Sequence, residues 1–131
     1  MDPKDVTLTP EEIASRVRFI EHKGIRILYI DSKDCSWGNM IAVLEEAMKY
    51  FRRYHNLRTL DDFRGAFATK EYIELAKKYG KELISKRRSK AAAIGIVGIK
   101  KILLDAYNAF TSDKLVVHKT MEEALDYLAK D

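Results

Sequence analysis

The spacing of hydrophobic residues changes along the chain between a two-residue and a helical repeat. Alternation over 16–21 and the branched run GIRILYID at 24–31 predict two strands that turn at 23–24 into a hairpin. A helical repeat follows over 36–54, and residues 58–63 form a short strand candidate. The first half therefore predicts a hairpin, a helix and a third strand.

The second half alternates helices and strands. Thr69 can cap a helix that we expect to run to residue 88, and the apolar run KAAAIGIVG then suggests a strand covered on both faces. The remaining expected elements are a helix over 99–110, a strand over 114–118 and a capped helix from 120. This order predicts an α/β fold with a mainly parallel sheet of about five strands and helices packed against it.

The N-terminal segment carries a helix start of its own, because residues 9–12 (TPEE) combine an N-cap threonine, a proline and a glutamate three residues after the cap. It predicts one or two turns through about Ser15. At 131 residues the chain fits one domain, and we expect a single domain over 1–131 in which 1–15 is an extension with a short helix.

Composition narrows the class of protein. The chain is 47% hydrophobic and 34% charged, as ordinary globular proteins are, and its one cysteine, Cys35, excludes a disulfide framework and a multi-cysteine metal site. The first twenty residues are polar and acidic, unlike a signal peptide, and no apolar run reaches the ~20 residues of a membrane span. We expect a cytoplasmic protein that needs no metal or cofactor.

The net charge of +4 is unevenly distributed. Residues 49–101 carry 15 Lys and Arg against 5 Asp and Glu, a net of +10. A basic middle favours an anionic partner, such as a lipid headgroup, an acidic protein face or nucleic acid. No nucleic-acid motif accompanies it, so we expect nucleic-acid binding to be at most weak; a solvated lysine-rich helix surface is the simpler interpretation.

The turn from Gly95 to Lys101 is the candidate anion site. Gly95 and Gly98 allow close approach where a buried strand passes into a helix, and Lys100 and Lys101 add charge beside the free N–H groups of the helix start. Arg64, after the neighbouring strand, can approach from the side. The alternative is that the two glycines only make a tight turn.

Other reactive residues do not converge on a catalytic set. Asp61 and Asp62 could bind a metal or accept a phosphoryl group, but strand alternation sends them to opposite faces, and a surface pair with Arg64 explains them more simply. Cys35 could act as a nucleophile with His22, His55 or His118, yet nothing in the sequence places them together. We therefore predict that the protein is not an enzyme.

The C-terminal third resembles STAS domains, which have the SpoIIAA-like fold. The helix pattern E-E-A-L-x-x-L is met at 122–128, and the chain also resembles small proteins called STAS/SEC14-like, whose pattern is met by Gly95, Gly98, Lys100, Lys101, Ile102, Leu103, Ala106, Asn108 and Phe110. The resemblance runs from about His22 to Leu128. It implies a stand-alone STAS-like domain that works by binding.

The resemblance also bears on regulation. Where phosphorylation-controlled antagonists have Asp-Ser-Ser-Gly, this chain has FATK at 67–70, so Thr69 keeps a hydroxyl but the aspartate and glycine are absent. A kinase-controlled switch is not expected. The leading hypothesis is a protein-interaction or regulatory module whose surface includes the start and basic face of the helix over 69–88: Thr69, Lys70, Lys77, Lys81 and Arg88.

The alternative is a binder or carrier of a small apolar, lipid-like or anionic molecule, as the SEC14 part of the family name implies. Five aromatic residues are the candidates to line its pocket, although core packing explains them too: Trp37, Tyr72, Tyr79, Tyr107 and Phe110. The hairpin leaves a strand edge, and such edges are often protected by pairing, so we also expect a homodimer.

Overall fold

The computed structural model describes residues 7–111 and 114–130. Within them, five strands form a sheet in the order β1-β2-β3-β4-β5. The strands are β1 (Val17–His22), β2 (Ile25–Asp31), β3 (Leu57–Asp62), β4 (Arg88–Ile94) and β5 (Val116–His118). β1 and β2 are antiparallel and every other pair of neighbours is parallel, which confirms the expected hairpin and mainly parallel sheet.

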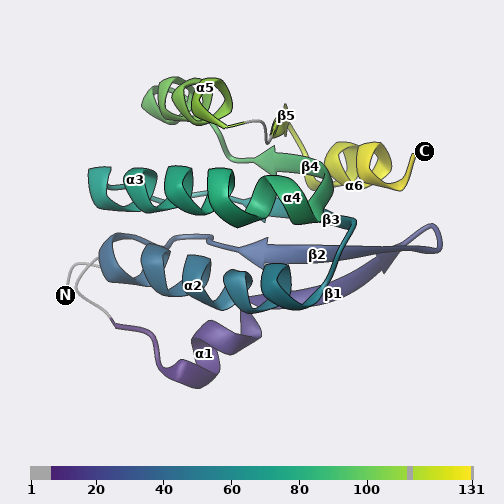
Figure 1. The fold of residues 1–131 in the computed structure, drawn as a ribbon, viewed down its shortest axis with the longest axis horizontal. Coiled ribbons are helices and arrows are strands. Elements are labelled where there is room, and N and C mark those ends of the chain that lie inside the picture. Colours follow the sequence, from purple (N-terminus) through teal and green to yellow (C-terminus); the bar gives the residue numbers. More distant parts are fainter. Residues whose placement is uncertain (1–6, 112–113, 131) are drawn as a thin grey trace.

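The helices cover both faces of this sheet (Figure 1). They are α1 (Pro10–Ser15), α2 (Trp37–Arg53), α3 (Lys70–Tyr79), α4 (Ser85–Arg87), α5 (Ile99–Phe110) and α6 (Met121–Ala129), with a π-helical turn, η2 (Gly80–Ile84), between α3 and α4. Buried residues of α2, α3 and α5 share a core with one face of the sheet, which we call the helix-layer face. α6 packs on the opposite face. No helix in the described ranges is long and apolar enough to cross a membrane.

Threonine side chains begin three of the helices, as their sequence positions predict. Thr9 accepts a hydrogen bond from the Glu12 amide at 3.2 Å, and the Glu12 carboxylate returns one from the Thr9 amide at 3.1 Å. The hydroxyls of Thr69 and Thr120 likewise accept hydrogen bonds from backbone amides in the first turns of α3 and α6. These bonds satisfy amides that the first helical turn leaves unpaired.

The expected helix over 69–88 is shorter and less regular than the sequence indicates. It passes into the π-helical turn at Gly80, ends at Arg87, and gives way to β4 at Arg88. Gly80 packs against α5: a Cβ added there would lie 2.6 Å from the hydroxyl oxygen of Tyr107. The missing side chain therefore lets α5 lie close to this part of the helix, which explains a glycine inside it.

The end of β4 comes very close to the end of β3. Gly95 has a φ of +82°, and a Cβ on it would lie 2.6 Å from the carbonyl carbon of Phe63 and closer still to the amide nitrogen of Arg64. The Phe63 amide also donates to the carbonyl of Ile94 at 2.9 Å. Gly95 is therefore fixed by a close backbone approach at the carboxyl edge of the sheet.

A matched pair of substitutions tests this close approach. Gly24, in the hairpin turn, has a similar φ of +79° but open space around its missing Cβ. We expect Gly24→Ala to cost about 1–2 kcal/mol of unfolding free energy through the strained φ alone. Gly95→Ala should cost at least about 3 kcal/mol, because the backbone must also move. Urea denaturation measures both, and equal losses would contradict the close approach.

Candidate functional site

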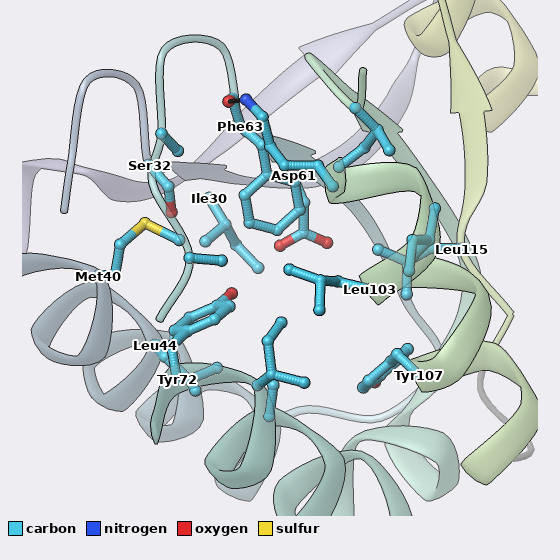
Figure 2. Close-up of a pocket in the computed structure, with 18 of the residues that line it drawn as sticks. Ile30, Ser32, Met40, Leu44, Asp61, Phe63, Tyr72, Leu103, Tyr107 and Leu115 are labelled. Carbon is cyan, nitrogen blue, oxygen red and sulfur yellow. Dashed lines mark hydrogen bonds between the residues drawn. The ribbon is translucent and has the colours of Figure 1, made fainter. Parts of the chain in front are cut away.

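A pocket lies between the helix-layer face of the sheet and the helices that cover it (Figure 2). Its volume is about 90 Å³, several times the roughly 10–15 Å³ that one water molecule needs. The wall is largely apolar and is formed by side chains of the sheet and of α2, α3 and α5. Its apolar residues include Ile30, Met40, Leu44, Leu103, Leu104 and Leu115. We call this cavity the helix-layer pocket.

Several polar side chains interrupt the apolar wall, including those of Arg88 and Lys100. Asp61 at the end of β3, Tyr72 on α3 and Ser32 just after β2 all line the pocket, and Figure 2 shows the Tyr72 hydroxyl and the Asp61 carboxylate on its inner side. Tyr72 is 8% exposed. Burial, and then the negative charge of Asp61, raise the pKa of Tyr72, so its hydroxyl stays protonated at neutral pH. A few convergent polar groups in an apolar cavity are typical of a small-molecule site.

Asp61 forms a buried ion pair with Arg88. The Arg88 Nη1 donates to the Asp61 Oδ2 at 3.2 Å and to the Thr59 Oγ1 at 2.9 Å, and the Arg88 side chain is 4% exposed. Its guanidinium also lies 5.7 Å from the centre of the Phe51 ring. The expectation that Arg88 belongs to an exposed basic helix face is therefore wrong. Arg88 is the first residue of β4, and its buried guanidinium neutralises the Asp61 carboxylate.

A bulge in the sheet makes this pairing possible. The register between β3 and β4 shifts at Leu57 and Arg58, so that Arg88 pairs with Leu57 while Lys90 pairs with Arg58. The extra residue puts Arg88 on the helix-layer face. Lys90 goes to the opposite face, where its ammonium lies 4.3 Å from the centre of the Tyr127 ring.

Asp62 occupies the opposite face from Asp61, as strand alternation predicts. It accepts hydrogen bonds from the Tyr29 hydroxyl at 2.6 Å and from the Arg64 Nε and Nη2 at 2.9 and 2.7 Å. Desolvation alone would raise the pKa of Asp62, but these hydrogen bonds outweigh it and hold the pKa below its usual value. The expected pair with Arg64 is present, although Asp62 is fully buried and only the arginine reaches the surface.

The residues of the predicted anion turn have partners within the protein. The Lys100 ammonium donates to the Phe63 carbonyl at 3.1 Å, and the Lys101 ammonium lies 2.6 Å from Asp105, one helical turn along α5. Gly98, at the start of α5, has a φ of +59°. The backbone of Arg64 lies against Gly95, but the Arg64 guanidinium is bonded to the Asp62 carboxylate on the sheet face that α6 covers. An anion at this turn would have to replace these contacts.

The predicted interaction surface is divided. Thr69 caps α3 and Lys70 follows it on the surface, whereas Lys77 and Lys81 lie further along the helix. The ammonium groups of Lys77 and Lys81 lie 5.6 and 5.3 Å from the ring centre of Phe110 on α5, which is 51% exposed. A basic and aromatic patch therefore spans α3 and α5.

The residues considered for nucleophilic catalysis lie apart. Cys35 is buried, and burial raises the pKa of its thiol, which disfavours the thiolate. His22 pairs with Asp126 of α6 at 2.7 Å, His55 contacts Arg87, and His118 packs against Tyr127. Among the described residues, no cluster of His, Cys, Asp and Glu could hold a metal ion.

The aromatic residues proposed to line a pocket divide into two groups. Tyr72 and Tyr107 line the helix-layer pocket. The Tyr79 hydroxyl instead donates to Glu45 at 2.7 Å, and Phe110 is half exposed. The side chain of Trp37 lies outside the part that the structure describes. The sequence analysis does not identify Ser32, Asp61 and Arg88 as pocket residues. The available signal was strand alternation, which sends one of the two carboxylates, Asp61 or Asp62, to the face that α3 covers.

No protein-family model and no curated protein matches the chain. Among solved structures, it is similar to an uncharacterized protein of the DUF3478 family with a SpoIIAA-like fold from Shewanella loihica PV-4. This chain has a SpoIIAA-like fold. The TM-score is 0.57 and the identity 17%, with 86% of this chain and 92% of that chain covered. The fold implied by the STAS resemblance is confirmed, and at this identity the likeness shows the fold alone.

The buried pair makes a prediction about stability. Arg88→Met should lower the free energy of unfolding by about 3–5 kcal/mol, because it leaves the Asp61 charge buried without its cation. The double variant Asp61→Leu/Arg88→Met removes both charges and should recover most of the loss. Lys101→Met, which breaks the exposed pair with Asp105, should change stability by less than about 1 kcal/mol. Urea denaturation of all three variants measures these changes in the free energy of unfolding. A loss of less than about 1 kcal/mol in Arg88→Met would contradict a stabilising buried pair.

Proposed function

We propose that this protein is a non-enzymatic STAS-like module that binds one small, mostly apolar molecule in the helix-layer pocket. The observation that carries the proposal is the largely apolar pocket of about 90 Å³ between the sheet and the helices that cover it, which is partly open to solvent. Apolar surface that stays in contact with water costs free energy, so an apolar pocket of this size needs an explanation. A bound molecule that completes the core supplies it.

The chemistry of the wall supports an apolar ligand. Its alanines, among them Ala47 on α2 and Ala76 on α3, leave space between the helices and the sheet. Burying a methylene group contributes about 0.8 kcal/mol, so a chain of eight carbons gains on the order of 6 kcal/mol. That corresponds to a dissociation constant of tens of micromolar. The site therefore suits reversible binding.

A fluorescent apolar probe, N-phenyl-1-naphthylamine, tests the proposal. We expect the wild-type protein to bind it at micromolar concentrations and Ala76→Leu to weaken binding at least tenfold, because the larger side chain fills the pocket. Ala106→Leu, the same change on the exposed side of α5, is the matched control and should bind as the wild type does. Absence of binding to the wild type, or equal weakening in both variants, would contradict the pocket. Native mass spectrometry of freshly purified protein should show a bound small molecule.

A second candidate function is the protein-interaction module that the sequence favours. The patch formed by Lys77, Lys81 and the half-exposed Phe110 supports it, and it suits an acidic partner with an apolar contact. Thr69 and Lys70 extend the proposed surface toward the start of α3. A homodimer is a further proposal; it would use β1, which pairs only with β2 among the described strands.

Affinity capture from the native cell separates this candidate from the pocket. We expect the triple variant Lys77→Gln/Lys81→Gln/Phe110→Ser to lose a partner that the wild type retains. Lys33→Gln/Lys49→Gln, which removes two charges elsewhere, should keep it. A partner held equally by all three proteins would show that the patch is not the docking surface.

A further inference from the structure

The Tyr72 hydroxyl points into the helix-layer pocket (Figure 2). Tyr72 is more than nine-tenths buried, and no hydrogen-bond partner for its hydroxyl is found among the described residues. Its oxygen is open to the pocket, and a hydroxyl in such a position is normally satisfied by water or by a ligand. The hydroxyl is therefore a hydrogen-bond donor directed at whatever occupies the pocket.

Asp61 supplies the complementary group. Its carboxylate lies on the inner side of the same cavity, and Figure 2 shows the carboxylate and the Tyr72 hydroxyl facing one another across it. A carboxylate has about four acceptor positions, and the Asp61 carboxylate, which accepts from Arg88 at 3.2 Å, also faces the pocket, where a ligand donor can reach it. An oxygen that both accepts and donates a hydrogen bond can bridge Tyr72 and Asp61.

The charge balance at this end of the pocket favours a neutral head group. Asp61 and Arg88 neutralise one another, so a charged group buried beside them would have no counter-charge of its own. The ammonium of Lys100 also borders the pocket and keeps its charge, because its partner at 3.1 Å is the neutral Phe63 carbonyl; an anion held there, away from Tyr72, is the alternative that the octanoate comparison below tests. A ligand carboxylate next to Tyr72 would face the negative charge of Asp61.

We propose that the apolar molecule of the proposed function, on which this inference rests, is an alcohol. Its hydroxyl oxygen accepts a hydrogen bond from Tyr72, its O–H donates a hydrogen bond to the Asp61 carboxylate, and its hydrocarbon part lies against the apolar wall of the helix-layer pocket. The pocket thereby discriminates between molecules of equal chain length by their head groups. Neither step involves bond breaking, so the site binds without chemistry.

Three compounds with an unbranched eight-carbon chain test this on the wild-type protein by displacement of N-phenyl-1-naphthylamine at pH 7. They are 1-octanol, which donates and accepts; octyl methyl ether, which only accepts; and octanoate, which is an anion. A hydrogen bond to a charged group contributes enough to change affinity about tenfold. We expect 1-octanol to bind about tenfold more tightly than either of the others.

Two tyrosine variants assign the donor. Tyr72→Phe removes only the hydroxyl and should weaken 1-octanol and the ether each by about fivefold, because both accept from it. The remaining advantage of the alcohol over the ether reports the contact with Asp61. Tyr79→Phe, which removes a hydroxyl bonded to Glu45 outside the pocket, is the matched control and should retain wild-type affinities.

The outcomes separate the two proposals. If the probe binds but the three compounds compete equally, the head group is not recognised, and the inference fails while the pocket remains. Tighter binding of octanoate, lost in Lys100→Met, would also overturn it and assign an acid to the site. Failure of the wild type to bind the probe would overturn the proposed function and this inference together.

Discussion

Two adjacent carboxylates end the central strand β3, and the alternation of a strand sends them to opposite faces of the sheet. Each is buried, so each requires a cation close by. Asp61 finds Arg88 on the helix-layer face, and Asp62 finds Arg64, together with the Tyr29 hydroxyl, on the other. The bulge in β4 brings Arg88 within reach of Asp61, and the turn after β3 brings Arg64 within reach of Asp62.

The same constraint shapes the candidate site. A charged pair cannot be covered by tightly packed apolar side chains without cost, and the helices above it present alanines and the Tyr72 hydroxyl. The space that results is apolar along most of its wall and polar at one end. A pocket of this kind holds an amphipathic molecule in one orientation. Binding would then complete both the packing and the hydrogen bonding of the core.

Sequence periodicity predicts most of the fold because each element buries one face: the hairpin, the helix over 36–54 and the opposed carboxylates are all observed. It misplaces Arg88 because the helical pattern continues through Lys86 and Arg87, and the bulge that turns Arg88 inward depends on the partner strand. Tyr72 and Tyr107 could be named as candidates to line a pocket, but the presence of the pocket itself could not be predicted. A cavity depends on how side-chain volumes meet across α2, α3 and the sheet, which spacing along one chain does not contain.

The most direct test of the central claim is a methyl NMR titration of the full chain with 1-octanol. Leu44 and Leu103 line the helix-layer pocket, while Ile27 and Leu128 lie in the core under α6 and act as internal controls. We expect saturable shifts at the methyl groups of Leu44 and Leu103 and unchanged signals at those of Ile27 and Leu128. Shifts at both pairs alike, or none at the pocket methyls, would contradict binding between the sheet and α2, α3 and α5.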